Sequence, residues 1–584
     1  MLDASQPFVL LDAAGGGTAR LYRAPEGVIA ARCGDIAQGM AQLDQARVRG
    51  RHLAGFVTYP GCLAIGGMAA PPDAPGMWFG SFADVSQLPA EAVPALLGDP
   101  AGAWTGALRP RIERAAYLRA FDAVAEWIRA GDIYQANLSF QAELPVGGSP
   151  LALYAALRPQ AGAGHGALVW TGAEWLLSFS PELFFELRDG RVRARPMKGT
   201  AERLPDPVAD AAAAAALAAD PKQRAENLMI LDLMRNDLSR IAQAGSVAVP
   251  DRFRVETYPT VHQLVSEVTA TLAPPCGVGD VLRALSPCGS ITGAPKRRAT
   301  EIIAAVEPES RGVYTGTIGR IDPDGSAAFN VAIRTLTLAG ERPDRATLGL
   351  GSGIVADSNG SAEWRECLAK GRFLHLPPRF DLIETMLFDP DAGVVLLERH
   401  LDRMAGSASA LGFAFDRHAA RNALQAATFR LDRRKRLRLL LGHGGALAIE
   451  AAPPPPTPAD PVTVALASLP VPPSDFRLRH KTSERGFYDR ARQAAGCFEV
   501  AFVDPDGMLT EGSFTSLFVP RGDRLATPPL ARGLLPGVLR AELIATGRAV
   551  EVDLTPDDLA GGFFVGNALR GLIPAVAAAR TPAL

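Results

Sequence analysis

A pair of adjacent prolines separates this chain into two stretches of regular structure. Pro377-Pro378 follows a helical pattern and precedes the strand-like run 381–388. Proline has no amide hydrogen to donate within a helix, so the pair ends the helix and leaves a short, stiff connection. The chain has 584 residues, which is more than one hydrophobic core normally supports. We therefore expect two domains, residues 1–375 and 380–584.

Both regions mix strand and helix patterns. Segments that alternate apolar and polar residues are interleaved with helical periods, which predicts α/β and α+β layers rather than an all-helical protein. In the second region, the strand-like runs 447–450 and 462–466 flank the proline-rich run 453–458. That composition is typical of an extended polyproline connector.

The bulk charge and the cysteines bear on partners and location. Lysine plus arginine number 60 and aspartate plus glutamate 62, a net charge of −2, so neither nucleic acid nor a membrane surface is expected as partner. The six cysteines are scattered without a C-x-x-C pair. This argues against a disulfide framework and is typical of a protein in a reducing compartment. The N-terminus has no basic segment followed by an apolar one, so we expect a cytoplasmic protein.

One lysine in the first region has the setting of a nucleophile. Lys198 stands directly before Gly199 and Thr200 in the strand-like run 192–200. A lysine before Gly-Thr places an amine at a backbone turn, where it can react once its proton is removed. The residues alone equally allow a surface lysine at the end of a strand.

Three glutamates of the first region suit a hard metal ion. Glu226 lies in the run 225–238, where apolar residues recur at helical spacing. Glu363 and Glu366 stand three apart in a second predicted helix, 361–370, and so share one face. Carboxylates from two helices are ligands that Mg²⁺ prefers. Spacing alone also fits a solvated helix face.

Six segments of the first region together resemble the chorismate-utilising enzymes, and in particular component I of aminodeoxychorismate synthase. They are 131–139, 180–184, 195–200, 225–238, 289–296 and 351–358, in the order seen in that family. The match covers about residues 110–375, the expected catalytic core. Within that family, lysine before Gly-Thr marks the aminodeoxychorismate synthases, whereas anthranilate synthases usually carry alanine there. The resemblance implies an α/β sandwich built on large antiparallel sheets.

The resemblance also implies a role for individual residues. Lys198 would attack C2 of chorismate while Glu182 protonates the departing 4-hydroxyl, after which ammonia adds at C4, and His262 would lie near the active site. Mg²⁺ would be held by Glu226, Glu363 and Glu366 against the ring carboxylate. The other substrate-binding residues would be Gln135, Thr200, Tyr314, Arg334, Gly351, Gly353 and Lys370, with the two glycines in a turn. A glutamine at position 135 argues against the isochorismate- and salicylate-forming relatives, which carry a water-activating lysine there.

The sequence shows no motif of an enzyme domain that would release ammonia from glutamine. No cysteine stands in a Gly-x-Cys-x-Gly elbow, the arrangement expected of a glutamine amidotransferase. We therefore expect free ammonia or a separate glutamine amidotransferase subunit as the donor.

The second region contains a lysine and a glutamate suited to pyridoxal phosphate. Lys481, expected at the end of a strand-like stretch, and Glu511, expected in a hairpin, are the minimum pair for a Schiff base and a protonated pyridine nitrogen. Spacing alone also fits structural residues. Residues 384–385, 399–403, 481, 510–512 and 535–540 resemble, in order, the fold-class-IV pyridoxal phosphate enzymes, with a two-part α+β fold.

That second resemblance assigns the cofactor contacts. It implies Lys481 as Schiff-base lysine and proton shuttle, Glu511 on the pyridine nitrogen, Arg399 on the phosphate, and backbone amides near Val538 and Leu539. Leu539 and Ser516 depart from the threonine and asparagine of many relatives, which weakens the detailed phosphate assignment. Class IV relatives are often dimers, so self-association through residues 380–584 is expected.

The two regions together predict one pathway. Class IV membership does not by itself separate a lyase from an aminotransferase, but a neighbour that makes 4-amino-4-deoxychorismate favours the lyase. We therefore expect a bifunctional enzyme that aminates chorismate and then eliminates pyruvate to give 4-aminobenzoate for folate biosynthesis. The alternative is an anthranilate synthase-like domain fused to a class IV aminotransferase.

Overall fold

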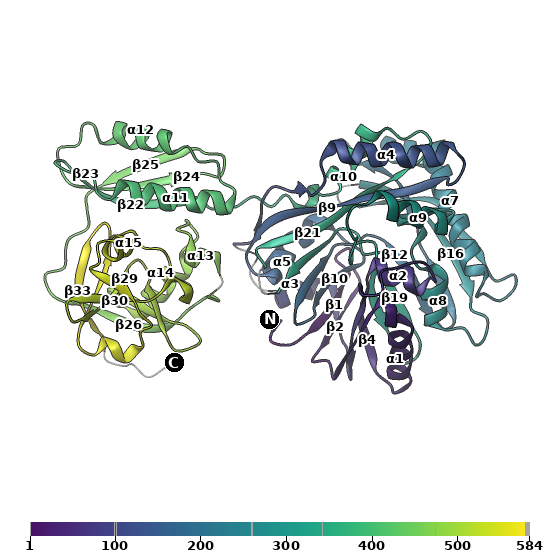
Figure 1. Cartoon of the computed structure of the whole chain (residues 1–584), viewed down its shortest axis with the longest axis horizontal. Helices are drawn as coiled ribbons and strands as arrows, with labels where there is room; N and C mark the ends of the chain where they lie inside the picture. The colour runs from purple at the N-terminus through teal and green to yellow at the C-terminus, as the bar shows by residue number, and fades with distance from the viewer. Residues whose placement is uncertain are drawn as a thin grey trace. The chain divides into compact units, whose positions relative to one another are not determined.

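The chain divides into two compact units, Met1–Leu376 and Pro377–Leu584 (Figure 1). The structure is a computed structural model that describes residues 2–97, 100, 102–258, 261–340, 343–473 and 475–578. Within those ranges, no helix is both long enough and apolar enough to cross a membrane.

The first unit is built on two antiparallel sheets. The first sheet runs β17 (Gly293–Ala294), β9 (Gln135–Gly147), β21 (Arg345–Ile354), β20 (Thr335–Ala339), β11 (Glu174–Ser178), β10 (Gly166–Trp170), β1 (Phe8–Asp12), β2 (Thr18–Arg23), β6 (Ser86–Pro89), with β7 (Trp104–Thr105) and β8 (Arg109–Pro110) also on β9. The second runs β14 (Met197–Glu202), β16 (Val261–Thr271), β13 (Arg191–Ala194), β12 (Leu183–Arg188), β19 (Ala327–Asn330), β18 (Thr317–Ile321), β4 (His52–Val57), β5 (Pro75–Phe82), β3 (Gly27–Arg32), with β15 (Ala248–Thr257) on β16.

Apolar side chains hold these sheets in a four-layer sandwich. Tyr22, Phe56 and Val169 belong to the cluster between the sheets. Helices cover the outer faces, because each presents one apolar stripe to a sheet. The first sheet is covered by α4 (Arg114–Arg129), α5 (Pro150–Ala161), α9 (Lys296–Val306) and α10 (Gly360–Ala369). The second is covered by α1 (Ile36–Val48), α2 (Tyr59–Ile65), α7 (Pro221–Ser239) and α8 (Val278–Leu285). The predicted α/β sandwich is confirmed.

Local sequence explains the two helices that were expected to carry carboxylates. Asp220 caps α7 by accepting hydrogen bonds from the Lys222 and Gln223 amides at 2.8 and 3.1 Å, with Pro221 in the first turn. Asn359 caps α10 in the same way. Both predicted helices are confirmed. The predicted strand 192–200 is instead divided, since β13 ends at Ala194 and β14 begins at Met197.

The second unit has two parts, as predicted. The smaller sheet runs β23 (Gly393–Val394), β22 (Leu382–Asp389), β24 (Lys435–Leu441), β25 (Leu447–Ala452) and packs with α11 (Leu397–Leu411) and α12 (Arg417–Thr428). The larger runs β28 (Leu509–Gly512), β27 (Glu499–Val503), β26 (Val462–Ser468), β33 (Gly571–Ala577), β32 (Phe563–Asn567), β29 (Ser516–Arg521), β30 (Arg524–Thr527), β31 (Ala549–Glu551), with α14 (Gly486–Ala495) and α15 (Val538–Ala545) against it.

The approach to Lys481 differs from the expected strand. The preceding residues form a short helix, α13 (Phe476–Arg479), because the Asp475 carboxylate caps its first turn. After this helix the chain turns against the smaller sheet, where the Ile383 amide donates to the Lys481 carbonyl at 2.9 Å. Lys481 is therefore fixed by β22 and not by a strand of its own.

Candidate active sites

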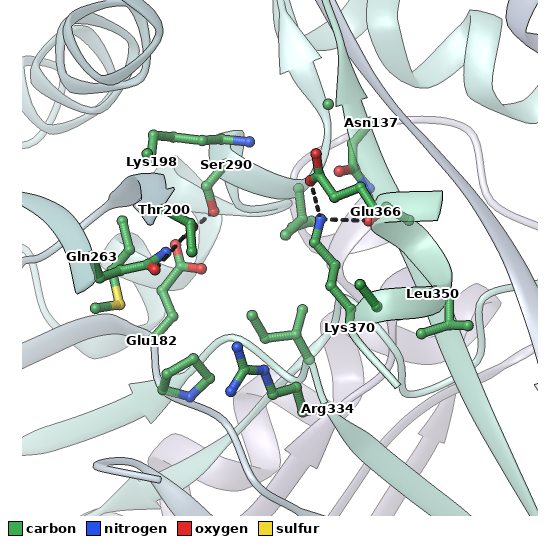
Figure 2. A pocket seen from close by; sticks show the side chains of 18 of the residues that line it. Asn137, Glu182, Lys198, Thr200, Gln263, Ser290, Arg334, Leu350, Glu366 and Lys370 are labelled. Atoms are coloured by element: carbon green, nitrogen blue, oxygen red, sulfur yellow. Dashed lines mark hydrogen bonds and ion pairs between the residues drawn. The ribbon is translucent and has the colours of Figure 1, made fainter. Parts of the chain in front are cut away.

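A cavity of about 500 Å³ in the first unit gathers most of the residues predicted there (Figure 2). It lies among β14, β21, α7 and α10 and the loops beside them. Its lining includes Glu182, Lys198, Thr200, Glu226, Tyr314, Arg334, Gly351, Gly353, Glu363, Glu366 and Lys370. Residues separated by more than 180 positions in the sequence thus meet in one pocket.

Lys198 is held at an irregular point of β14. Gly199 has φ +102°, a conformation that residues with a side chain rarely adopt, and the pairing of β14 with β16 shifts register there. The Asn227 amide on α7 donates to the Lys198 carbonyl at 3.2 Å. Burial lowers the pKa of Lys198, and the nearby Lys370 ammonium adds to the effect. The side chain is therefore a better amine nucleophile than an exposed lysine.

Glu182 is a buried acid facing the same pocket. It stands just before β12, and the Ser290 hydroxyl donates to its carboxylate at 2.7 Å. Burial raises the pKa of Glu182 to about 7, although Ser290 and Lys198 oppose the rise. At neutral pH the carboxyl carries a proton in a large share of molecules. Ser290 received no role from the sequence, although its segment was part of the resemblance.

The three predicted metal ligands line the pocket without forming a closed metal site. Glu366 pairs with Lys370 at 2.9 Å, and Lys370 also donates to the Gly351 carbonyl at 2.7 Å. Burial raises the pKa of Glu226. Across the described residues, no group of three His, Cys, Asp or Glu side chains is close enough to hold a metal ion. The donors have the chemistry that Mg²⁺ prefers, and the pair with Lys370 engages one carboxylate oxygen of Glu366, Oε1.

Gly351 and Gly353 lie in the interior of β21 and not in the expected turn. A Cβ on Gly351 would overlap the Ser139 side chain, and one on Gly353 would lie 3.1 Å from Gln135 Nε2 and 3.3 Å from Lys198 Nζ. The glycines therefore provide space for the pocket. Gln135, predicted to bind substrate, is buried behind Gly353 and is not part of the cavity lining, and neither polar atom of its amide has a hydrogen-bond partner among the described residues.

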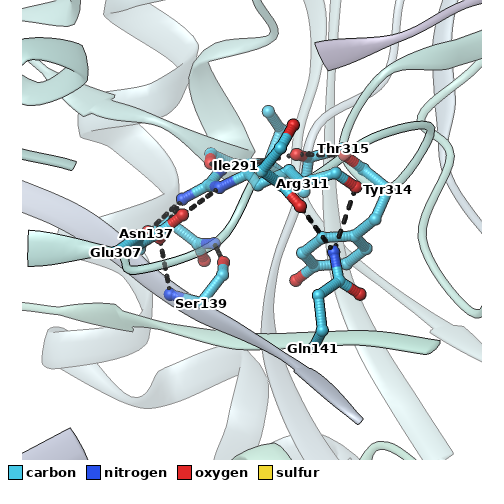
Figure 3. Close-up of polar contacts among 9 residues, drawn as sticks. Asn137, Ser139, Gln141, Ile291, Glu307, Arg311, Tyr314 and Thr315 are labelled. Carbon is cyan, nitrogen blue, oxygen red and sulfur yellow. Dashed lines mark hydrogen bonds and ion pairs between the residues drawn. The ribbon is translucent and has the colours of Figure 1, made fainter. Parts of the chain in front are cut away.

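A buried ion pair fixes the wall behind the site (Figure 3). The Arg311 guanidinium bonds Glu307, the residue just after α9, and it donates to the carbonyls of Asn137 at 2.6 Å and Ile291 at 2.9 Å. The Ser139 amide donates to Glu307 at 2.8 Å. These contacts join β9, the Ser290 segment and the loop that carries Tyr314. No motif in the sequence pointed to this pair.

His262 is placed away from the cavity. Its side chain is buried and contacts Asp210 through Nε2 at 2.9 Å and Thr257 through Nδ1 at 3.0 Å. Its neighbours Val261 and Gln263 line the cavity, and successive residues of a strand point to opposite faces. His262 therefore ties β16 to neighbouring elements and does not reach the pocket.

A second cavity, of about 490 Å³, lies within the second unit and contains Lys481, Glu511, Val538 and Leu539. Burial, with the Arg403 guanidinium next in effect, lowers the pKa of Lys481 to about 7. Burial raises the pKa of Glu511 to about 7, although Arg485 and the hydroxyl of Tyr488, which donates at 2.5 Å, oppose the rise.

This cavity fits pyridoxal phosphate. The N-terminus of α15 opens into it, and a Cβ on Gly537 would lie 2.5 Å from the Ser516 hydroxyl, so the glycine leaves a narrow cradle beside free helix amides. Thr482 Oγ1 is buried without a hydrogen-bond partner in the described ranges. A lysine, a buried glutamate and an anion cradle are the groups that this cofactor requires.

Arg399, the predicted phosphate ligand, lies outside the second cavity, whereas Arg403 on the next helical turn lines it. Arg399 on α11 pairs with Glu542 at 2.5 Å and lies outside the cavity lining. Arg403, one turn further, lines the cavity, where it pairs with Glu384 at 2.7 Å and donates to the Pro536 carbonyl at 3.1 Å. Arg399 and Arg403 are four residues apart and therefore on one face of the helix, so the sequence allowed either of them to reach the cavity.

Comparisons with known proteins match both regions. The model of the chorismate binding enzymes matches residues 83–375, and that of the class IV aminotransferases matches residues 381–578. Aminodeoxychorismate synthase component 1 of Salmonella typhimurium is 43% identical over 272 residues, which cover 46% of this chain and 59% of that protein. An anthranilate synthase component 1 of Halobacterium salinarum is 38% identical over 293 residues, covering 49% and 55%. The chain thus spans less than two thirds of the length of these relatives.

A solved structure supports the fold of the first unit. Anthranilate synthase component I from Streptococcus pneumoniae superposes with a TM-score of 0.53 at 24% identity, over 64% of this chain and 94% of that one. Similarity at this level of identity speaks for the fold alone.

Proposed function

The chain belongs to the chorismate-binding enzymes and carries a class IV aminotransferase domain after that region, and from this premise we propose that it converts chorismate to 4-aminobenzoate in two steps. The observation that carries the proposal is the pairing of Lys198, with its lowered pKa, and Glu182, with its raised pKa, in one pocket. A second lysine and glutamate then meet in the class IV domain.

In the first step, we propose that Lys198 and Glu182 act at two different carbons of the chorismate ring, C2 and C4. Lys198 Nζ bonds to C2, the ring double bonds shift, and the C4–O bond breaks while Glu182 protonates the departing hydroxyl to water. Ammonia then bonds to C4, the double bonds return, and the C2–N bond to Lys198 breaks. The product is 4-amino-4-deoxychorismate. This sequence requires a free amine and a protonated acid at the same pH, which the two pKa shifts favour.

We propose that the remaining polar groups of this pocket hold the two carboxylates of chorismate. Glu226, Glu363 and Glu366 would hold Mg²⁺, which supplies positive charge for the ring carboxylate. The Arg334 guanidinium would take the enolpyruvyl carboxylate by its planar fork, with the Tyr314 hydroxyl beside it. Arg334 adopts φ +50°, a conformation that is uncommon for residues with a side chain and that tends to occur at functional sites.

In the second step, we propose that Lys481 removes the proton from C4 of the amino intermediate while the bond from C3 to the ether oxygen breaks, which leaves an aromatic ring and releases enolpyruvate, and enolpyruvate takes up a proton from solvent to become pyruvate. Pyridoxal phosphate, when bound, supplies the electron sink beside the substrate nitrogen. Lys481 with a pKa of about 7 can accept that proton at neutral pH. Glu511 would hold the pyridine nitrogen, while Arg403 and the α15 N-terminus would hold the phosphate.

We further propose that ammonia comes from a separate glutamine amidotransferase subunit, supported by the name of the relative that is called component 1. The six cysteines are all free, which supports the cytoplasmic location that we infer. Self-association through the class IV domain stays a prediction.

The test is product analysis with the purified chain. We expect chorismate, ammonium and Mg²⁺ to give 4-aminobenzoate when pyridoxal phosphate is present, and an amino-chorismate intermediate when it is removed. Anthranilate as the product would contradict the role of Lys198 and favour the alternative fusion. An intermediate that never aromatises, with the cofactor bound, would make the second domain an aminotransferase.

A further inference from the structure

The second cavity holds more positive charge than the cofactor requires. The cations that line it are Arg403, Arg436, Arg438, Lys481, Arg485, Arg492 and Arg570, against the anions Asp489 and Glu511. A concentration of guanidinium groups in a partly desolvated cavity is costly unless anions enter it. The arginines therefore indicate an anionic ligand beyond the phosphate.

Most of these arginines already have a partner. Arg403 pairs with Glu384, Arg436 with Glu450 at 3.0 Å, and Arg492 with Asp489 at 3.5 Å. Arg570 donates to the Pro456 carbonyl at 3.2 Å and lies over the Phe514 ring. Among the described residues, Arg438, Arg485 and Arg570 have no ion-pair partner, and Arg570 is held instead by the Pro456 carbonyl.

Arg438 and Arg485 both face the lysine. Arg438 lies on β24, where Leu437 and Leu439 are buried in the core and the alternate side chains face the cavity. Arg485 occupies the N-cap position of α14 without a capping side-chain hydrogen bond, lies 4.4 Å from the centre of the Tyr488 ring, and donates to the Ser513 carbonyl at 3.5 Å. Arg438 Nε and Arg485 Nη1 are buried without hydrogen-bond partners in the described ranges. Arg403, Arg485 and Arg438 each help to lower the pKa of Lys481.

We propose that Arg438 and Arg485 form a dicarboxylate subsite beside Lys481, one guanidinium for each carboxylate of the substrate. The inference rests on the proposed function and names what selects its second substrate. 4-Amino-4-deoxychorismate has a ring carboxylate and an ether-linked carboxylate in a meta arrangement, with the reacting amine next to the latter. An amino acid with a single carboxylate would leave one guanidinium unpaired, so the subsite favours the lyase substrate over an ordinary aminotransferase substrate.

The test uses the full chain loaded with pyridoxal phosphate and two unreactive probes. 3-(Carboxymethoxy)benzoate has both carboxylates, and 3-methoxybenzoate has only the one on the ring. The absorbance of the bound cofactor reports binding in the second unit alone. We expect the diacid to bind at least about 10-fold more tightly than the monoacid, and Arg438→Gln to remove about 10- to 100-fold of diacid affinity, the usual range for a charge-assisted hydrogen bond.

Three controls keep the result readable. Arg434→Gln removes the same charge just before β24, from an exposed arginine paired with Asp389, and should leave diacid binding unchanged. Arg438→Lys should restore part of it. Cofactor content at limiting pyridoxal phosphate should be equal in wild type and Arg438→Gln.

Each failure has a distinct meaning. Equal affinity of wild type for diacid and monoacid overturns the subsite. So does an Arg438→Gln variant that loses cofactor affinity instead, since Arg438 would then serve the phosphate. A clear diacid preference in a protein that does not aromatise supplied 4-amino-4-deoxychorismate would keep the subsite and contradict the lyase. With turnover, Arg438→Gln should raise KM far more than it lowers kcat.

Discussion

The two cavities use the same pair of groups, a half-buried lysine and a buried glutamate, but they surround the lysine with opposite charge. Around Lys198 the carboxylates Glu182, Glu226 and Glu366 oppose the effect of burial on its pKa. Around Lys481 the nearest charges include Arg403, Arg438 and Arg485, which add to it. Burial lowers both lysine pKa values, but only in the second cavity do most of the neighbouring charges act in the same direction.

The difference reflects what each cavity has to bind. A carboxylate-rich pocket suits a divalent cation that carries a substrate carboxylate, whereas an arginine-rich pocket suits a phosphate and carboxylates that bind without a metal ion. The charged groups that bind the ligand therefore also set the pKa of the lysine in each cavity.

Replacing Lys481 should separate the two halves most sharply. We expect Lys481→Ala to slow 4-aminobenzoate formation by about 10,000-fold, the upper end for loss of a general base, because the residue would also anchor the cofactor. Chorismate consumption should continue and the amino intermediate should accumulate. Chromatography of the products measures both. Normal 4-aminobenzoate production by this variant would rule out Lys481 as the base.

The reciprocal change is Lys198→Ala. We expect chorismate amination to fall by about 1,000-fold or to be diverted, because the residue that bonds to C2 is gone. Conversion of supplied 4-amino-4-deoxychorismate should be unchanged, which serves as the internal control for folding of the chain. If the variant still made 4-aminobenzoate from chorismate at the wild-type rate, the nucleophile would have to be another group.

The third test concerns Glu384, the buried carboxylate that pairs with Arg403 beside the arginine-rich cavity. Burial alone would raise the pKa of Glu384, but Arg403 and His400 lower it to about 2 from its ordinary 4.5. The folded state therefore holds this proton less well than the unfolded state. The stability so gained, about 3 kcal/mol, is present above pH 4.5 and is lost as the pH falls toward 2.

Glu384→Gln should remove that stability at neutral pH and flatten its dependence on acid. Hydrogen exchange of β22 and β24 in urea, at about pH 7 and about pH 3, measures both effects. Glu450→Gln is the matched control, since its pair with Arg436 is half exposed and surface pairs contribute at most about 1 kcal/mol. A variant as stable as wild type at pH 7 would show that the pair contributes nothing.

The carboxylate helices could be predicted from the sequence, because α7 and α10 have apolar residues at regular spacing and capping residues at their starts. The sequence did not decide which face of a strand or which turn of a helix places a side chain in the cavity. His262 alternates with Val261 and Gln263 along a strand, and only the pairing of β16 decides which face meets the pocket. Arg399 and Arg403 are one helical turn apart, and no local rule states which of them finds Glu542.

Other features depend on contacts between distant segments. The spacing of four between Glu307 and Arg311 was visible in the sequence. The bond from Arg311 to the Asn137 carbonyl was not, because it joins residues 174 positions apart. The free guanidinium of Arg438 is recognisable only when the partners of the other arginines are known. Gly351 and Gly353 suggested a turn, and the structure shows that glycine is needed in a strand where three elements crowd together.

The two buried glutamates sharpen the comparison, because loss of a hydroxyl donor should raise the pKa of both but should have opposite effects on the two steps. Tyr488 donates to Glu511 and so lowers its pKa. Tyr488→Phe should raise that pKa further, and an ionised Glu511 is what the pyridine nitrogen needs. We expect the second step to slow by about 10-fold near neutral pH and to recover as the pH rises. Supplied amino intermediate isolates this step, and a rate independent of pH would contradict the assignment of Glu511.

Ser290→Ala removes the corresponding hydroxyl from Glu182, which the first step needs in its protonated form. Loss of the 2.7 Å hydrogen bond should raise the pKa of Glu182 above about 7, because the bond favours the charged carboxylate. The alkaline decline of chorismate amination should therefore move upward by about one pH unit, while the rate near pH 6 changes little. Initial rates across the pH range measure this, with Glu182→Gln, which has no proton to lose, as the control without that decline. An acidic limb that moves upward instead, with no shift of the alkaline decline, would mean that Glu182 acts as a base in the limiting step, and the contrast between the two glutamates would then vanish.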